Sequence, residues 1–304
     1  MRRMLIVAAL ICAAPAQAQD DRLIDVHRHA AWPWMEDEPY RDRTLAEMDA
    51  NGVGIALLSI HDYDDLKHWA GAAPGRFLVG VKVPCPRNLD EPRYRCFPSS
   101  EGWVDLAWLE REIRAGRVKA LHEVAPSYYG ISSANPRLGP YFALAHRYGI
   151  PVGIHTQRGP APGGRNSTRS DPNCCPDYDP AMGNPALLRP VLDRYSGLKL
   201  WIQHVGSGRG DYGPYWAETL SLLADYPNVF LDLSITNGAM PVEQYEEALR
   251  RLIDAGFGDR IMFGSDNLPI APIRERLATM RWLSDTQRRA ILHDNAARFF
   301  GMAD

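Results

Sequence analysis

A chain of 304 residues is long enough for one large domain or two small ones, and an α/β barrel takes about 250 residues as a single domain. The net charge of −3 and the lack of long basic runs argue against nucleic acid as the main partner. No segment is an apolar run of the roughly 20 residues that a membrane-spanning helix needs, so stable membrane insertion is not expected.

The N-terminus has the pattern of a secretory signal peptide. Two arginines are followed by an apolar run over residues 4–14, and an Ala-Gln-Ala triplet then ends at Ala18. The run is too short to cross a bilayer as a stable helix, and a small-x-small triplet is a usual cleavage site. We expect cleavage after Ala18, which leaves a signal peptide (residues 1–18) and a single domain (residues 19–304). The protein is therefore expected to be exported, either to a periplasm or to the medium.

Eight short apolar runs alternate with amphipathic segments along the rest of the chain. Runs with little polar alternation are typical of strands buried on both faces, and the segments between them have helical periodicity. Eight strands, each followed by a helix, predict an α/β fold of the (β/α)8 TIM-barrel type with elaborated loops at its C-terminal face. A doubly wound open sheet would require a glycine-rich turn after the first strand, and HRHAAWPW is no such turn. The predicted strands are residues 23–27, 53–60, 77–83, 118–124, 150–155, 198–204, 228–235 and 260–266.

Four cysteines lie in two proline-rich segments, at Cys85 and Cys96 and at Cys174 and Cys175. An exported chain meets an oxidising compartment, so an even number of loop cysteines suggests disulfides. Three pairings are open, and free thiols are the alternative.

Histidines and one aspartate stand at the ends of predicted strands. His27 and His29 end the first strand, and residues two apart on a strand point to the same side, so both imidazoles can reach one metal ion. His155, His204 and Asp266 end the fifth, sixth and eighth strands. The C-terminal ends of barrel strands meet on one face, so these residues are expected to converge there. Imidazoles and a carboxylate suit zinc, with manganese or iron as alternatives.

The other histidines have weaker positions. His61 follows the second strand and is a further candidate for the same face. His68 and His146 lie in helical segments and are expected to be solvated. His122 and Glu123 are neighbours in the fourth strand, so His122 is expected to face the helices if Glu123 faces the inside of the barrel.

Five motifs, in this order, resemble the amidohydrolase superfamily in its amidohydrolase-2 branch of metal-dependent hydrolases: LIDVHRH, VGIHT, WIQHVGSG, IMFGSDNLP and ILHDNAARFFG. The resemblance spans nearly all of residues 19–304. It implies that His27, His29, His155 and Asp266 bind the metal, and that His204 polarises the substrate or binds a second ion.

Glu123 departs from part of this family pattern. Some members carry a carbamylated lysine at the end of the fourth strand, where it bridges two metal ions. Lys119 lies too deep for that role, whereas Glu123 is at the right level, and HEVAPSYY resembles the TatD-like branch, in which a glutamate is a ligand. Glu123 could equally orient a histidine beside a single ion. In a two-ion site Glu123 would lie between two sets of ligands: His27, His29 and Asp266 on one ion, His155 and His204 on the other.

These parts predict hydrolysis of an amide, ester, lactone or related bond in a small organic substrate. The metal lowers the pKa of a bound water toward neutral, and Asp266 takes the proton and passes it to the leaving group. His204 stabilises the oxygen on which negative charge develops.

Aromatic and basic residues in the loops are candidates for substrate binding. Trp32 and Tyr128 would form walls against an organic ring, and Arg158 and Arg209 would grip a carboxylate. Simple packing of the loops and solvated surface charge explain the same residues equally well.

Two other functions are open. One is a metal-dependent decarboxylase resembling aminocarboxymuconate semialdehyde decarboxylase, although export favours hydrolysis because such decarboxylases mostly act in the cytosol. The other is a metal-binding pseudoenzyme, which would lack the proton-transferring acid that Asp266 supplies. The sequence leaves the oligomeric state open, a homo-oligomer included.

Overall fold

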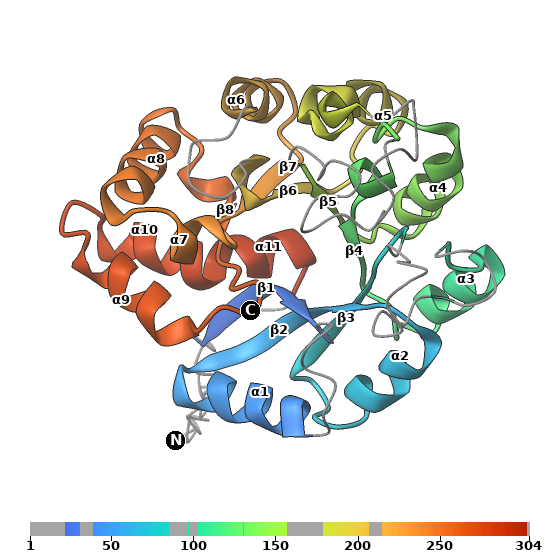
Figure 1. Ribbon diagram of the computed structural model, residues 1–304, viewed down its shortest axis with the longest axis horizontal. Coiled ribbons are helices and arrows are strands. Elements are labelled where there is room, and N and C mark those ends of the chain that lie inside the picture. The colour runs from blue at the N-terminus through green and yellow to red at the C-terminus, as the bar shows by residue number, and fades with distance from the viewer. Residues whose placement is uncertain are drawn as a thin grey trace, which may run out of the picture.

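The computed structural model describes residues 22–30, 39–84, 97, 103–129, 131–156, 179–206 and 215–302. The core of the protein is one sheet of eight parallel strands that neighbour one another in chain order. Figure 1 shows these strands in a ring with helices around it, which is the predicted (β/α)8 TIM barrel. The strands are β1 (Leu23–His29), β2 (Val53–Ile60), β3 (Phe77–Val81), β4 (Ala120–Val124), β5 (Val152–His155), β6 (Leu200–Gln203), β7 (Val229–Asp232) and β8 (Ile261–Met262).

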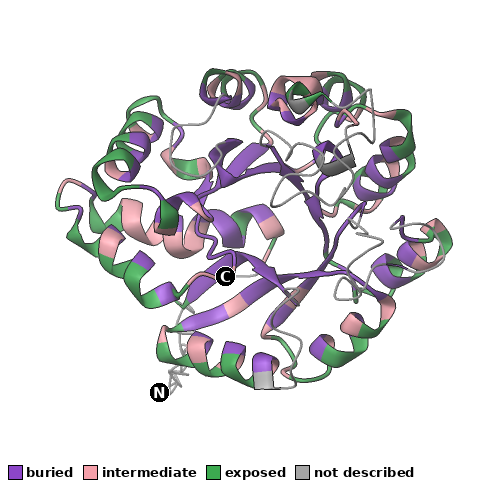
Figure 2. Cartoon of the chain, viewed as in Figure 1, coloured by how far each residue is buried: buried purple, intermediate pink, exposed green. Residues whose placement is uncertain are grey.

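The helices form the outer layer and bury one side against the strands (Figure 2). In α3, Leu109 and Ile113 are four residues apart and buried, while Arg111 and Arg114 are exposed, as expected for an amphipathic surface helix. The helices are α1 (Pro39–Ala50), α2 (Tyr63–Ala70), α3 (Leu106–Arg114), α4 (Gly139–Tyr148), α5 (Arg189–Arg194), α6 (Trp216–Asp225), α7 (Thr236–Ala239), α8 (Val242–Asp254), α9 (Ile270–Thr279), α10 (Asp285–Arg289) and α11 (Asn295–Phe300).

Backbone hydrogen bonds between β1 and the segment after β8 close the barrel. The Val26 N–H donates to the Phe263 carbonyl at 3.0 Å, and the Asp266 N–H donates to the His27 carbonyl at 2.7 Å. The second of these bonds joins two predicted metal ligands, so closure of the barrel also positions the site.

Helix α11 covers one end of the barrel. Figure 1 shows α11 across the centre of the ring. The rings of Phe299 and Phe300 lie 5.8 and 5.6 Å from the indole of Trp201 in β6, and the ammonium of Lys199 donates to the Phe299 carbonyl. Lys199 precedes β6, so α11 covers the N-terminal end of the barrel and leaves the opposite end to the site.

The prediction that His122 faces the helices is wrong. Leu121 and Val124 of β4 pair with Val152 and Ile154 of β5, so three steps along β4 match two along β5. This irregularity breaks the alternation of side chains. His122 is fully buried inside the barrel, where its Nε2 lies 3.1 Å from the Val26 carbonyl.

Several sequence features lie outside the described residues: the predicted signal peptide and the cysteines at positions 85, 96, 174 and 175. Within the described ranges, no helix is both long enough and apolar enough to cross a membrane.

Gly153 of β5 provides a test of the barrel interior. A Cβ atom at this position would lie 2.4 Å from Cζ2 of Trp201, whose Nε1 is held by a hydrogen bond to Asp232. We expect Gly153→Ala to lower the free energy of unfolding by about 1–3 kcal/mol, measured by chemical denaturation, because the indole cannot move aside without losing that bond.

Gly139→Ala is the matched control for this prediction. Gly139 has a helical φ of −49°, and a Cβ atom there would meet nothing within 4 Å. Alanine should leave the stability unchanged or raise it slightly. If Gly153→Ala were as stable as the control, the tight contact with Trp201 would be contradicted.

Candidate functional site

The six residues predicted as metal ligands lie together at the C-terminal end of the barrel. They come from five strands: β1, β4 and β5 carry their residues inside the strand, whereas His204 and Asp266 follow β6 and β8. All are buried, with at most 7% of the residue exposed. They are His27, His29, Glu123, His155, His204 and Asp266.

His27, His29 and Asp266 form the tightest part of the site. Asp266 Oδ1 lies 2.8 Å from His29 Nε2 and 3.7 Å from His27 Nε2. One ligand atom from each residue lies within 4.8 Å of the others. Two atoms that are each about 2.1 Å from a tetrahedral ion are about 3.4 Å apart, so small side-chain movements would let these three hold one divalent ion.

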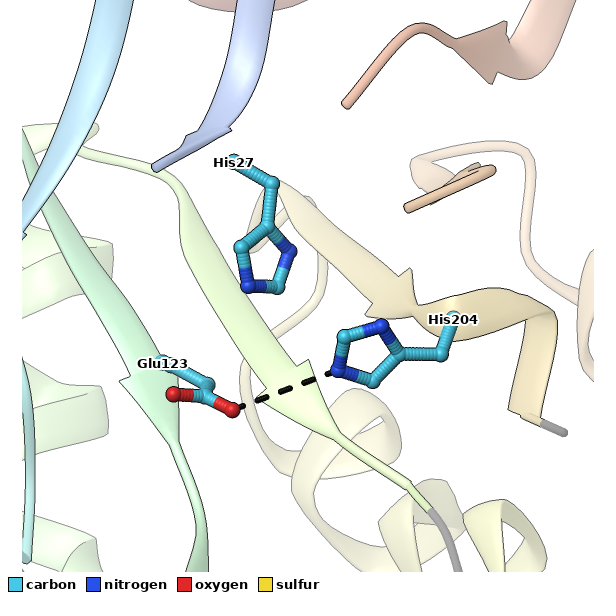
Figure 3. Close-up of side chains that lie close together, drawn as sticks. All are labelled: His27, Glu123 and His204. Carbon is cyan, nitrogen blue, oxygen red and sulfur yellow. Dashed lines mark ion pairs between the residues drawn. The ribbon is translucent and has the colours of Figure 1, made fainter. Parts of the chain in front are cut away.

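Glu123 lies between this group and two further histidines. Its Oε2 is 3.8 Å from His29 Nε2, and its Oε1 is 3.5 Å from His155 Nε2 and 4.0 Å from His204 Nε2. Figure 3 shows Glu123 and His204 pointing toward one another, with His27 beside them. His27, Glu123 and His204 also form a group whose ligand atoms lie within 4.8 Å. The first expected ligand set, His27, His29 and Asp266, is therefore present as a group. The second group contains His27 with Glu123 and His204, and the expected His155 lies beside Glu123.

Lys82, which follows β3, also contacts Glu123. Its ammonium forms an ion pair with Glu123 Oε2, and both side chains are less than a tenth exposed. Burial opposes ionisation of Glu123, but Lys82 and the nearby histidines hold the pKa of this carboxyl well below its usual range. Glu123 is therefore an anion with a cationic partner.

Asp232, the last residue of β7, is a functional residue that the sequence analysis missed. It is fully buried, and its Oδ2 accepts hydrogen bonds from His27 Nδ1 at 3.0 Å and Trp201 Nε1 at 3.2 Å. Its Oδ1 accepts from the backbone N–H groups of His204 and Ser234, each at 3.1 Å. Asp232 thus orients one predicted ligand through its ring and another through its backbone.

The hydrogen bonds at Nδ1 define which nitrogen of each ring faces the site. His27 Nδ1 donates to Asp232, and His204 Nδ1 donates to the Ser234 carbonyl at 3.2 Å. A neutral ring with its proton on Nδ1 presents a lone pair at Nε2. His27 Nε2 is buried and makes no hydrogen bond to a described residue. A metal ion fits this atom, because it would provide the partner that the described residues do not.

The remaining candidates differ in position. His61 is buried, with its ring 5.8 Å from that of His29, so it reaches the same end of the barrel. His68 and His146 are exposed, as predicted. Trp32, Arg158, Arg209 and the side chain of Tyr128 lie outside the described residues.

One signal in the sequence could have identified both Asp232 and Lys82 as site residues. Asp232 and Lys82 are charged residues inside the predicted seventh and third strands, at the ends that face the site. A charge in an otherwise apolar buried strand requires a partner, which makes it a site candidate.

The pKa of His27 gives a test of this arrangement. Burial lowers the pKa, but the carboxylates of Asp232 and Asp266 outweigh it and raise the pKa from 6.5 to about 9. In the metal-free protein, the His27 ring should therefore be a cation at neutral pH and lose a proton near pH 9. The pH dependence of the imidazole nitrogen chemical shifts would measure the pKa of His27, with the resonances assigned by comparison with His27→Asn. Loss of the His27 proton below pH 7 would contradict the prediction.

The same shift links His27 to stability. Because the folded pKa exceeds the unfolded value, His27 stabilises the metal-free protein fully below about pH 6.5, and this contribution is lost as the pH rises to about 9. Asp232→Asn should lower the pKa of His27 by removing the nearest carboxylate. Asp225→Asn, which changes a surface carboxylate paired with Arg189, is the control and should leave it unchanged.

Comparisons with known proteins agree with the fold. The family model described as amidohydrolase matches residues 24–302. A search of curated proteins found no sequence match.

Solved structures that are similar over nearly the whole chain include the following three. A putative 2-pyrone-4,6-dicarboxylic acid hydrolase from Pseudomonas putida has a TM-score of 0.61 and 19% identity, covering 93% of this chain and 99% of its own. The 2,6-dihydroxybenzoate decarboxylase from Rhizobium has a TM-score of 0.58 and 16% identity, with 92% and 99% covered.

The third is 5-carboxyvanillate decarboxylase from Novosphingobium aromaticivorans, solved with manganese and 4-hydroxy-3-methoxy-5-nitrobenzoic acid. It has a TM-score of 0.57 and 17% identity, with 92% of this chain and 96% of its own covered. At these identities the three structures share the barrel fold with this protein. Because the family model spans nearly the whole barrel, the chain belongs to the amidohydrolase family.

Proposed function

We propose that this protein is a divalent-metal-dependent hydrolase that cleaves an amide, ester, lactone or related bond of a small organic substrate. The observation that carries the proposal is the approach of the Asp266 carboxylate to His27 and His29 at the mouth of the barrel. Asp266 Oδ1 is 2.8 Å from His29 Nε2, and His27 Nε2 is a buried atom with no hydrogen bond in the described structure. A carboxylate held against two imidazoles in this way suits both metal binding and proton transfer.

His27, His29 and Asp266 would hold the ion, with Glu123, His155 and His204 beside it. A bound divalent cation would supply a water that ionises near neutral pH and an electrophile for a substrate oxygen. Zinc suits this donor set, and manganese, which the Novosphingobium decarboxylase contains, is the alternative.

Asp266 is proposed as the proton-transferring group. Burial favours its neutral form, but His27 and His29 hold the pKa of Asp266 far below its usual range. The carboxylate is therefore ionised at neutral pH, so it can take the proton of the attacking water and deliver it to the leaving group.

His204 is proposed to act as an acceptor. Its Nδ1 donates to the Ser234 carbonyl, so a neutral ring would present the Nε2 lone pair toward the site. This favours binding of a cation or a proton at Nε2 over the role suggested by the sequence, in which His204 donates to a developing oxyanion. The latter role would require a second ring proton.

Decarboxylation of a small carboxylic acid is the second candidate. Two observations favour it. Decarboxylases of aromatic acids are among the similar solved structures. Lys82 also places a cation within the site, where it could attract a substrate carboxylate.

Isotope labelling distinguishes the two reactions. A panel of lactones, esters, amides and aromatic acids would be screened with the zinc- and manganese-loaded protein. Hydrolysis inserts one oxygen from labelled water into the acid product. Decarboxylation releases carbon dioxide, and in heavy water a deuteron replaces the carboxyl group on the carbon that carried it. Deuteration without oxygen insertion would overturn the proposed hydrolysis and establish the second candidate.

Asp266→Asn tests the proposed role of the carboxylate. We expect kcat to fall by at least about 100-fold, because the amide cannot accept the proton. Chelation of the metal should abolish activity, and added metal should restore it. Asp225→Asn is the surface control and should keep wild-type kcat. Retention of wild-type kcat by Asp266→Asn would contradict the assignment.

We also propose that the enzyme works after export. The N-terminal arginines, the apolar run over residues 4–14 and the triplet ending at Ala18 support this. The mature protein recovered from cells should begin at Gln19 when its N-terminus is sequenced. An N-terminus that retains the apolar run would contradict cleavage.

A further inference from the structure

Lys82 is a buried cation inside the site, and the proposed hydrolysis assigns it no role. Its side chain is 9% exposed, and its backbone N–H donates to the Ile60 carbonyl at 3.1 Å, which fixes the end of β3 beside β2. Among the described residues, Glu123 is the acid with which its ammonium forms an ion pair. Burial of a charged amine is costly unless a carboxylate compensates its charge. The ion pair with Glu123 is therefore what allows Lys82 to remain charged inside the site.

Lys82 engages the carboxylate that a second metal ion would need. Its ammonium contacts Glu123 Oε2, while Oε1 faces His155 Nε2 at 3.5 Å and His204 Nε2 at 4.0 Å. A second divalent ion held by these three residues would lie only a few ångströms from the ammonium. At that separation the repulsion between a divalent and a monovalent cation is large, even with an effective dielectric constant of about 20.

The charges of the site are consistent with one ion. Among the described residues at its centre, three carboxylates carry negative charge and the ammonium of Lys82 carries positive charge. The carboxylates are those of Glu123, Asp266 and Asp232. With neutral histidines these groups leave two negative charges, which one divalent cation balances. A second divalent ion would leave an excess of positive charge in a buried site.

We infer that Lys82 takes the place of a second cation and, through its ion pair with Glu123, limits the site to one divalent ion beside His27, His29 and Asp266. This inference rests on the proposed metal-dependent function and names the residue that determines its metal content. Lys82 is a positioning residue here: it acts through Glu123.

Metal content per chain tests the inference. Wild type and Lys82→Met would be saturated with zinc, freed of excess metal and measured by elemental mass spectrometry. We expect one ion in wild type and two in Lys82→Met, because loss of the ammonium should strengthen binding of a second ion by at least about 100-fold. Addition of Glu123→Gln to Lys82→Met should restore one ion, because the second ion needs that carboxylate.

Lys119→Met is the matched control, since it makes the same chemical change at an exposed lysine just before β4. It should bind one ion, as wild type does. Two ions in wild type, or one in a folded Lys82→Met, would overturn the role of Lys82 and leave the metal-dependent function intact. No metal bound by wild type would instead overturn the proposed function itself.

A second measurement tests the inference on wild type itself. Wild type titrated with manganese(II) should give the electron paramagnetic resonance spectrum of an isolated ion up to one equivalent, and no exchange-coupled signal beyond it. A coupled pair in wild type would overturn the inference. Lys82→Arg, which keeps the charge, should behave as wild type does.

Discussion

The site depends on the burial of one carboxylate, that of Asp232. Moving an ionised carboxylate out of water costs several kcal/mol unless hydrogen bonds replace the lost hydration. Burial favours the neutral acid, yet His27 and the other donors lower the pKa of Asp232 to about 2. The donors come from β1, β6 and the turn after β7, so satisfying one anion fixes three parts of the barrel together. The predicted metal ligands His27 and His204 are thereby oriented by the protein itself.

The same region holds strained backbone that the surrounding hydrogen bonds stabilise. His204 and Asp266 have φ angles of 57° and 51°, in the left-handed region that residues with a Cβ atom seldom adopt. Each such residue costs about 1–3 kcal/mol. The His204 N–H donates to Asp232 and the Asp266 N–H donates to the His27 carbonyl, so both turns are held in place. Both strands end earlier than the sequence predicts, β6 at Gln203 and β8 at Met262, so His204 and Asp266 reach the site from the segments that follow the strands.

The sequence by itself determined the barrel and most of the side chains at its mouth. Eight apolar runs alternating with amphipathic segments specify parallel strands covered by helices, and each run overlaps an observed strand. Since all barrel strands end on one face, strand position alone predicts that His27, His155 and Asp266 meet. Local signals suffice here because the direction of a strand and the period of its side chains are local properties of the chain.

The tertiary structure decided which neighbours share the interior and how charges pair across it. The irregular pairing of β4 with β5 places both His122 and Glu123 inside the barrel, and this depends on register with another strand. The partners of Asp232 and Lys82 lie on strands far away in sequence. A buried charge is costly unless an opposite charge lies within a few ångströms. Which carboxylate lies that close to a buried cation depends on tertiary packing, because the two residues are far apart in the sequence.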